Sequence, residues 1–449
     1  MLLRTVAHFA PSVFFLLWRR KITHNTLAGE KPDLSACVKW LERIATECEL
    51  ELQQVSFVPG LPVVVLTQRG TDATLPAVGL NCHMDVVPVV AERWDKLPAG
   101  ETPFSAWEDK DGKIYARGSQ DMKCVGAQYL CALRHLKRRG VKLLRTVHTI
   151  WVPDEEIGGE DGMKRFVRTV HTIWVPDEEI GGEDGMKRFV TSDLFRSLNL
   201  GIVMDEGLAF TENKFVVFTG ERTAIWARLE AVGPVGHASK LIPNTAIDRL
   251  STAIRKLSTI RSENVHRLES DPKLALGDVT TVNITVLHGG TTNDGGKTFA
   301  PNVIPSDAFL IADIRVALED YNVVVQTLKD ISREEKLELT FQNKFDETEG
   351  PSPYSDRNSV WMRVIEDAIR KTTPDAELER AIFPAATDSR YVRRVGLPSF
   401  GFSPMRRTPS LLHDHNEYLE RSVYLEGVEI MTALVHQLAS VPAQPGHKL

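Results

Sequence analysis

The sequence predicts an α/β protein with a mixed central sheet, into which a second, two-layer α+β domain is inserted. Three observations lead to this prediction. Strand-like and helix-like segments alternate in the first part of the chain, their period changes from residue 223 onward, and the first pattern returns after residue 346. At 449 residues the chain is also longer than one ordinary core requires, so two domains are expected.

Residues 1–222 should form most of the large domain. Short apolar runs, typical of buried strands, alternate here with a helical pattern. Strands are expected at 63–67, 77–82, 146–152 and 200–204, and a helix at 121–136. Because strands that alternate with helices usually pair in parallel, the sheet should be at least partly parallel.

Residues 223–345 have the pattern of a self-contained inserted domain. The order of the expected elements is β-α-β-β-α-β, which is typical of a two-layer unit. These elements are expected at 224–232, 244–262, 279–287, 308–316, 321–331 and 337–341. A stretch rich in helix and strand breakers follows, and residues 346–449 return to the large domain with a helix at 360–371 and a strand at 399–402.

A perfect tandem duplication interrupts the large domain. The 23 residues 145–167 (copy one), RTVHTIWVPDEEIGGEDGMKRFV, recur without change as residues 168–190 (copy two). Solenoid repeats are diverged and number at least three, so a recent duplication or a faulty gene model explains the doubling better. Each copy contains a strand-like run that ends in Asp-Glu-Glu. One of the two acidic motifs is therefore expected to be surplus.

Composition limits which binding partners and which cellular compartment are expected. A net charge of -6 argues against nucleic acid, and no apolar stretch is long enough to span a bilayer, so no membrane partner is expected. Five cysteines, odd in number and sparse, indicate a reducing compartment, and the cytoplasm is expected. Two interpretations of residues 1–20 stay open, a targeting segment or a first amphipathic helix that packs on the domain.

Histidines and carboxylates gather at expected strand ends and loops. His83 and Asp85 lie two residues apart at a strand end, so they share a face, where the carboxylate can orient a metal-bound imidazole. Asp121 begins a helix, Asp205 ends another strand, and His413 lies near the C-terminus. The carboxyl ends of strands in an open α/β sheet meet at one edge. Two histidines with several carboxylates are the donor set expected for paired zinc ions.

Six motifs together resemble the M20 metallopeptidase family. In chain order they are HMD at 83–85, ARGSQDMK at 116–123, VPDEE in each copy, MDEG at 204–207, GHAS at 236–239 and LLHDHNE at 411–417. The resemblance runs from about residue 11 to 445, and residues 385–393 and 401–409 favour the aminoacylase branch. It implies a zinc-exopeptidase-like catalytic domain and an inserted dimerisation or lid domain, and hence a homodimer.

The resemblance also implies an activity, the hydrolysis of the amide bond of N-acyl-L-amino acids to a carboxylate and a free L-amino acid. It implies two zinc ions per subunit. His83 and Asp205 would hold one ion, Asp121 would bridge both, and the second Glu of the acidic motif with His413 would hold the other. The first Glu would be the general base beside a metal-bound hydroxide, and Asp85 would belong to the catalytic set.

Three further residues match positions with a role in substrate binding or catalysis in the family. His237 matches a histidine that reaches the partner subunit's active site and stabilises the oxyanion. Asn302 and Arg390 match residues that hold the substrate's free carboxylate. Residues 291–300 form a longer link than is usual in the family, which leaves the shape of the substrate pocket open.

The two copies allow two threadings of the chain. With copy one in the core, Glu155 is the base and Glu156 the ligand, but the extra residues interrupt a helix. With copy two, Glu178 is the base and Glu179 the ligand, and the extra residues leave in a loop. Loops tolerate insertions better than helices, which favours copy two, whereas the spacing from the upstream motifs is kept by copy one.

Two other functions are not excluded by the sequence. A dipeptidase of the same family would cleave free dipeptides in preference to N-acyl amino acids. Alternatively, the duplication leaves an inactive or misfolded paralogue with a dimerisation or binding role. The preferred acyl group and side chain of a substrate cannot be read from these motifs.

Overall fold

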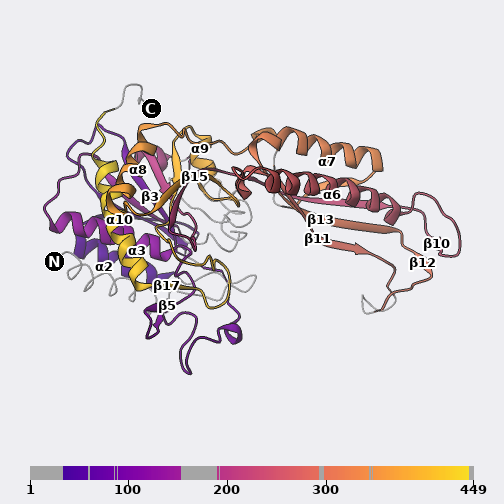
Figure 1. The fold of residues 1–449 in the computed structure, drawn as a ribbon, viewed down its shortest axis with the longest axis horizontal. Helices are drawn as coiled ribbons and strands as arrows, with labels where there is room; N and C mark the ends of the chain where they lie inside the picture. The colour runs from indigo at the N-terminus through magenta and orange to yellow at the C-terminus, as the bar shows by residue number, and fades with distance from the viewer. Residues whose placement is uncertain are drawn as a thin grey trace. The chain divides into compact units, whose positions relative to one another are not determined.

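The structure is a computed structural model that describes residues 34–58, 61–84, 86–87, 89–152, 190–191, 193–292, 298–342, 345 and 347–443. The chain divides into two compact units. Unit 1 comprises Met1–Gly220, Tyr354–Ala381 and Thr387–Leu449, and unit 2 comprises Glu221–Pro353 and Ile382–Ala386. Figure 1 shows the elements of each unit. The interpretations of residues 1–20 fall outside the described residues.

An eight-stranded mixed sheet forms the centre of unit 1 and confirms the predicted α/β fold class. Its order is β1-β2-β6-β3-β7-β16-β8-β15. The four middle strands run parallel, while β2 and β8 pair antiparallel with their neighbours β6 and β16. Their bounds are β1 Glu51–Val58, β2 Leu61–Gln68, β3 Ala77–His83, β6 Val147–Val152, β7 Leu200–Asp205, β8 Lys214–Glu221, β15 Glu377–Phe383 and β16 Ser399–Gly401.

Helices pack on this sheet and bury its middle strands. Every residue of β3 and β7 is buried, as expected for parallel strands inside an α/β core. The C-terminal helix α10 packs against both α3 and α8, as Figure 1 shows. The helices of unit 1 are α2 Ser35–Cys48, α3 Lys123–Arg138, α5 Asp193–Ser197, α8 Val360–Thr372, α9 Ser389–Arg394 and α10 Arg421–Ala439, with the short η1 Ala91–Arg93.

A glycine brings α3 close to the sheet. At Gly126 a Cβ atom would lie 2.4 Å from the sulfur of Cys82 and 2.6 Å from the ring of Trp151. These distances are too short for any side chain, so glycine is needed for this approach. The same approach holds the start of α3 near the ends of β3 and β6, where the candidate site lies.

A small three-stranded sheet supports the loops at that edge. It consists of β4 Trp107–Glu108, β5 Lys113–Tyr115 and β17 Tyr418–Glu420, in the order β17-β5-β4. The rings of Trp107, Tyr115 and Tyr418 stack along it, with centroids 5.5–5.7 Å apart. These strands hold segment 113–121 beside segment 413–420.

Unit 2 is a four-stranded antiparallel sheet with two helices. The strand order is β11-β13-β9-β14, and Figure 1 shows α6 and α7 along the same face. A capping box of Thr245 and Asp248 begins α6. The elements are β9 Thr223–Val232, β10 Gly236–His237, α6 Ala246–Ser270, η4 Leu276–Asp278, β11 Thr281–Gly289, β12 Val303–Ile304, β13 Asp307–Val316, η5 Leu318–Asp320, α7 Tyr321–Glu335, β14 Glu338–Phe341 and η6 Glu347–Glu349. A role for this unit in dimerisation or as a lid stays a prediction.

The central sheet contains the strand of copy one, so the preference for copy two is wrong. Strand β6 lies between β2 and β3. Arg145, the first residue of copy one, donates hydrogen bonds from its guanidinium to the carbonyl oxygens of Val441 at 2.6 Å, Pro76 at 2.7 Å and Pro442 at 2.8 Å. Residues 153–189, which include most of copy two, lie outside the described residues.

The position of copy one sets where the extra residues lie. Copy one reaches the sheet from α3 through residues 139–146 alone, so the 23 surplus residues fall between β6 and α5 in the sequence. Copy two in the sheet would lengthen the link from α3 by 23 residues and shorten the link to α5 by the same number. The two loop-closure terms therefore largely offset each other, and the spacing from the upstream motifs, which copy one keeps, is the sequence signal that agrees with the structure.

None of the described helices is both long and apolar enough to cross a bilayer. All five cysteines of the chain are free thiols. Burial raises the pKa of the Cys82 thiol to about 12, so this residue is neutral although it adjoins the site.

Candidate metal centre

His83, Asp121 and Glu206 converge at the carboxyl edge of the central sheet. His83 is the last residue of β3, Glu206 follows the last residue of β7, and Asp121 lies two residues before α3. One donor atom of each residue lies within 4.8 Å of the donor atoms of the other two. This is the edge where ligands bind in open α/β sheets, because the strand ends leave their side chains free of the core.

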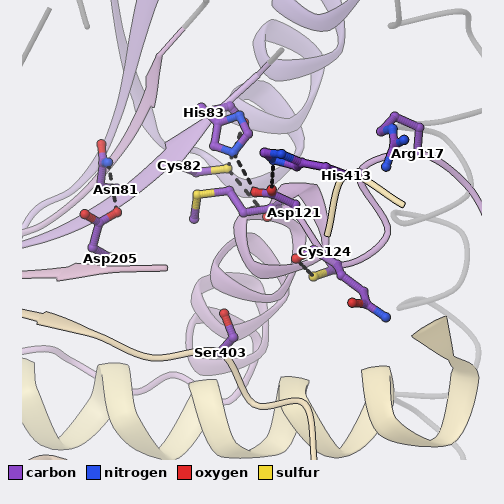
Figure 2. A network of polar contacts seen from close by, with 12 residues as sticks. Asn81, Cys82, His83, Arg117, Asp121, Cys124, Asp205, Ser403 and His413 are labelled. Atoms are coloured by element: carbon purple, nitrogen blue, oxygen red, sulfur yellow. Dashed lines mark hydrogen bonds and ion pairs between the residues drawn. The ribbon is translucent and has the colours of Figure 1, made fainter. Parts of the chain in front are cut away.

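Asp121 lies between two histidines. Nε2 of His83 is 3.2 Å from Oδ1, and Nε2 of His413 is 3.1 Å from Oδ2. Figure 2 shows both rings directed at this one carboxylate. Burial alone would raise the pKa of Asp121, but the hydrogen bonds from His413 and His83 outweigh it and hold that pKa well below its usual range. The carboxylate therefore stays ionised, with one oxygen toward each histidine.

This donor set fits a divalent cation. Imidazole nitrogens and carboxylate oxygens are the usual protein ligands of zinc. Glu206, which is half-buried, places a second carboxylate within reach of the same point.

Glu206, and not the expected Asp205, is the carboxylate of the 204–207 motif that joins this cluster. Oδ1 of Asp205 accepts a hydrogen bond from Nδ2 of Asn81 at 3.1 Å, and Oδ2 accepts one from Oγ of Ser389 at 2.8 Å. Figure 2 shows Asp205 paired with Asn81 and apart from the two histidines. Asp205 thus fastens the end of β7 to β3 and α9, which leaves its neighbour to face the cluster.

The remaining predicted ligands and bases lie outside the described residues. These are Asp85 and the glutamates of both copies, Glu155, Glu156, Glu178 and Glu179. The backbone of copy one nevertheless leaves the sheet at the site, because the last residue of β6, Val152, is the parallel partner of His83.

Arg390 belongs to the same unit as the cluster. It is the second residue of α9, its side chain is buried, and Nη1 donates to the carbonyl oxygen of Thr387 at 2.9 Å. The preceding residue, Ser389, is the one that bonds Asp205. The chain therefore carries a buried guanidinium next to the residue that bonds Asp205.

His237 and Asn302 are brought together in unit 2. His237 lies in β10 opposite Val303 of β12, and the amide of Ala238 donates to the carbonyl oxygen of Asn302 at 2.9 Å. Nδ1 of His237 is 2.8 Å from Oγ of Ser239, and the histidine side chain is exposed. Two residues 65 positions apart in the sequence thus lie side by side on one short ribbon.

Two buried residues beside the ligands were not found by sequence reasoning. Glu417 is fully buried and forms an ion pair with Arg117 at 2.8 Å. Gln120 precedes Asp121 and is also buried. Both stand inside the motifs that were recognised, but their polar contacts run to backbone groups of distant loops, which no local pattern reveals.

Comparison with known proteins agrees with the site. The model of peptidase family M20/M25/M40 matches residues 79–437. Aminoacylase-1B of Rattus norvegicus is 42% identical over 437 residues, and Aminoacylase-1 of Homo sapiens is 41% identical over 441 residues, with 97% of each chain covered in both cases. The crystal structure of an M20 family metallo-carboxypeptidase from Sulfolobus solfataricus superposes with a TM-score of 0.66 at 17% identity, covering 97% of this chain and 99% of the other. The chain belongs to peptidase family M20/M25/M40, in its aminoacylase-1 branch.

Proposed function

We propose that this protein hydrolyses N-acyl-L-amino acids at a dinuclear zinc centre. The observation that carries the proposal is Asp121, whose two oxygens face His83 and His413 while the half-buried Glu206 completes the cluster. The relatives that share about 41% of its residues over nearly the whole chain are named aminoacylase-1. A small-molecule substrate follows from that likeness.

In this proposal His83 and Glu206 would hold one zinc ion and His413 would contribute to the second, with Asp121, which lies between the two histidines, serving both. The bound ions would polarise the substrate carbonyl and lower the pKa of a water molecule. The residues of the chain fix where these donors stand. Asp205, through Asn81 and Ser389, keeps the end of β7 in place, so that Glu206 is presented at the sheet edge.

Glu155 is proposed as the general base and Glu156 as the remaining ligand. Strand β6 ends at Val152, beside His83, and these glutamates follow three and four residues later. Three and four residues span at most about 10 and 14 Å, so this length of chain allows both glutamates to reach the cluster. A carboxylate next to the ligands and not bound to them can take a proton from the attacking water and return it to the leaving nitrogen.

Substrate recognition is assigned to Arg390, Asn302 and His237. A buried guanidinium offers two parallel donors, which suits the free carboxylate of an N-acyl amino acid. Asn302 and the exposed His237 lie on one ribbon of unit 2, so they can act on the same substrate. His237 would donate to the developing oxyanion in the partner subunit's site.

A homodimer formed through unit 2 is therefore part of the proposal. Strand β11 is an edge strand of its sheet, and it exposes the apolar side chains of Val286 and Leu287, which are 39% and 63% accessible. Exposed apolar edges are usually covered by another strand or chain. If the pure protein sediments as a monomer, the proposed homodimer is wrong. The free cysteines suit a reducing compartment, and we propose the cytoplasm.

Metal content and substrate preference test the proposal together. The purified protein should contain two zinc ions per chain and should hydrolyse N-acetyl-L-methionine with a kcat/KM at least about 100-fold above that for the free dipeptide Ala-Met, a gap of about 3 kcal/mol. The reverse preference would identify a dipeptidase. A protein that holds zinc and cleaves neither compound, or that holds none, would be an inactive paralogue.

A further inference from the structure

We propose that Gln120 and Glu417 form a reciprocal lock, a pair of positioning residues that sets the spacing between Asp121 and His413. The inference rests on the two-metal site proposed above and assigns a role to residues that do not bind metal in it. Each residue of the pair uses its side chain to hold the backbone of the other's loop. The two loops are residues 116–121, which end at Asp121, and residues 409–418, which contain His413.

Glu417 holds the Asp121 loop from inside. Its Oε1 accepts hydrogen bonds from the amide of Gln120 at 2.6 Å and from that of Asp121 at 3.4 Å. Its Oε2 accepts from the amide of Gly118 at 3.0 Å and from Nη1 of Arg117 at 2.8 Å. A single carboxylate, fully buried, therefore accepts from three backbone amides, from the Ser119 hydroxyl at 3.4 Å and from one guanidinium.

Gln120 holds the His413 loop in return. Its Nε2 donates to the carbonyl oxygens of Pro409 at 3.0 Å and Tyr418 at 2.8 Å. Its Oε1 accepts from the amide of Leu411 at 2.9 Å. The amide thus uses both its donors and its acceptor on three backbone groups that flank His413 on either side.

The His413 loop needs such support more than the other ligand positions do. His83 lies in β3, whose backbone is fixed by two neighbouring strands. His413 lies in a loop, and its φ of +62° is in the left-handed region, which is unfavourable for a residue with a side chain. Such a conformation persists where surrounding contacts impose it, and the lock supplies contacts on both sides of it.

The lock therefore predicts unequal effects on the two metal ions. Loosening it shifts His413 relative to Asp121, so the ion on the His413 side loses affinity. The ion on the side of His83 keeps His83 and Glu206 at the ends of β3 and β7, so it changes little when only the His413 loop is loosened, as through Gln120. Loosening at Glu417 also frees the Asp121 loop and therefore reaches both ions. A residue that merely supported the fold would lower stability without separating the two binding steps.

Two variants remove opposite halves of the lock. Glu417→Gln puts an amide NH2 group against backbone N–H donors and leaves the buried Arg117 without its carboxylate. Gln120→Met keeps the size of the side chain and removes all three hydrogen bonds to the His413 loop. The matched control is Glu426→Gln, which breaks the ion pair of Glu426 with Arg406, 2.9 Å long and in the same unit, and touches neither loop.

The experiment is a calorimetric titration of the metal-free full-length proteins with Zn²⁺, with thermal unfolding measured in parallel. For Gln120→Met, the second binding step should weaken about 10- to 100-fold, as substitutions behind metal ligands generally do, while the first step changes less than about threefold. Glu417→Gln, which also frees the Asp121 loop, should weaken both steps, and the second step more than the first. Glu426→Gln should lower the unfolding temperature and leave both binding steps unchanged.

Each outcome bears on one part of the inference. A folded Gln120→Met protein whose second-step affinity equals that of wild type would overturn the lock. An equal weakening of both steps in Gln120→Met would also overturn it. So would a weakening of the second step by the same amount in Glu426→Gln. If Glu417→Gln does not fold, Gln120→Met decides. A wild-type protein that takes up one ion overturns the two-metal function and the lock with it, whereas two ions with unchanged variants overturn the lock alone.

Discussion

At the scale of single residues, charge and burial explain the arrangement of the site. Asp121 keeps its negative charge although it is buried, because imidazole nitrogens lie near both of its oxygens. Asp205 is buried as well, and its oxygens are occupied by Asn81 and Ser389. The two carboxylates therefore have different tasks, one in the cluster and one behind it.

Sequence reasoning at this scale found most of the cluster and missed one member. His83, Asp121 and His413 were singled out because each stands at a strand end or loop with metal-ligand chemistry, and the structure brings them together. Asp205 and Glu206 are adjacent carboxylates of one matched motif, and the family resemblance was carried onto the first of them. The deciding contact, from Ser389, comes from residues that are distant in the sequence.

Substitution of the two adjacent carboxylates should separate their roles. Glu206→Gln should lose one of the two zinc ions at stoichiometric zinc, because a ligand is gone. Asp205→Asn should still bind two ions, with affinity lowered about 10-fold, because Asp205 only positions Glu206 through its hydrogen bonds to Asn81 and Ser389. Metal analysis after gel filtration measures both. Loss of an ion from Asp205→Asn alone would restore the assignment made from sequence.

At the scale of elements, the strand β6 decides which copy of the duplication belongs to the core. Trp151 in this strand is fully buried, meets the ring of Trp40 edge-on at 6.1 Å and packs where Gly126 makes room for it. The sequence predicted the strand itself, since both copies have the same apolar run. It did not predict the copy, because the two strands are identical and the connections on either side of them change length in opposite directions.

Other element boundaries differ for similar reasons. Helix α6 continues to Ser270, beyond the expected end at 262, and Arg267 near its end pairs with Asp320 of η5 at 2.9 Å. The strands of the small sheet have two or three residues each and were not predicted. Their stability comes from pairing partners far along the chain, which short segments do not reveal.

The matched tryptophans of the two copies test this assignment. Trp151→Ala should lower the free energy of unfolding by about 3–5 kcal/mol, because it removes a fully buried ring from the core. The same change in copy two, Trp174→Ala, should cost less than about 1 kcal/mol. Urea unfolding of both variants provides the comparison. Equal losses, or a larger loss for Trp174→Ala, would contradict the placement of copy one.

At the scale of the whole molecule, the fold and the reaction were predictable while the consequence of the duplication was not. Six motifs spread over most of the chain identified the family and, through it, the two-unit α/β fold. The 23 surplus residues have no counterpart in that pattern. In the sequence they follow the strand of copy one, whose first residue, Arg145, is anchored to the carbonyl oxygens of Val441, Pro76 and Pro442. Arg168 of copy two offers the same guanidinium, so this contact alone does not choose the copy.

The kinetics of two matched variants test which copy supplies the general base and whether a glutamate plays that role. Steady-state hydrolysis of N-acetyl-L-methionine is measured for Glu155→Gln and Glu178→Gln, each with its zinc content. Glu155→Gln should lose about 10²- to 10⁴-fold in kcat, the contribution of a general base, and Glu178→Gln should keep the wild-type rate. Loss of activity in Glu178→Gln with full activity in Glu155→Gln would contradict the account, as would full activity in both variants.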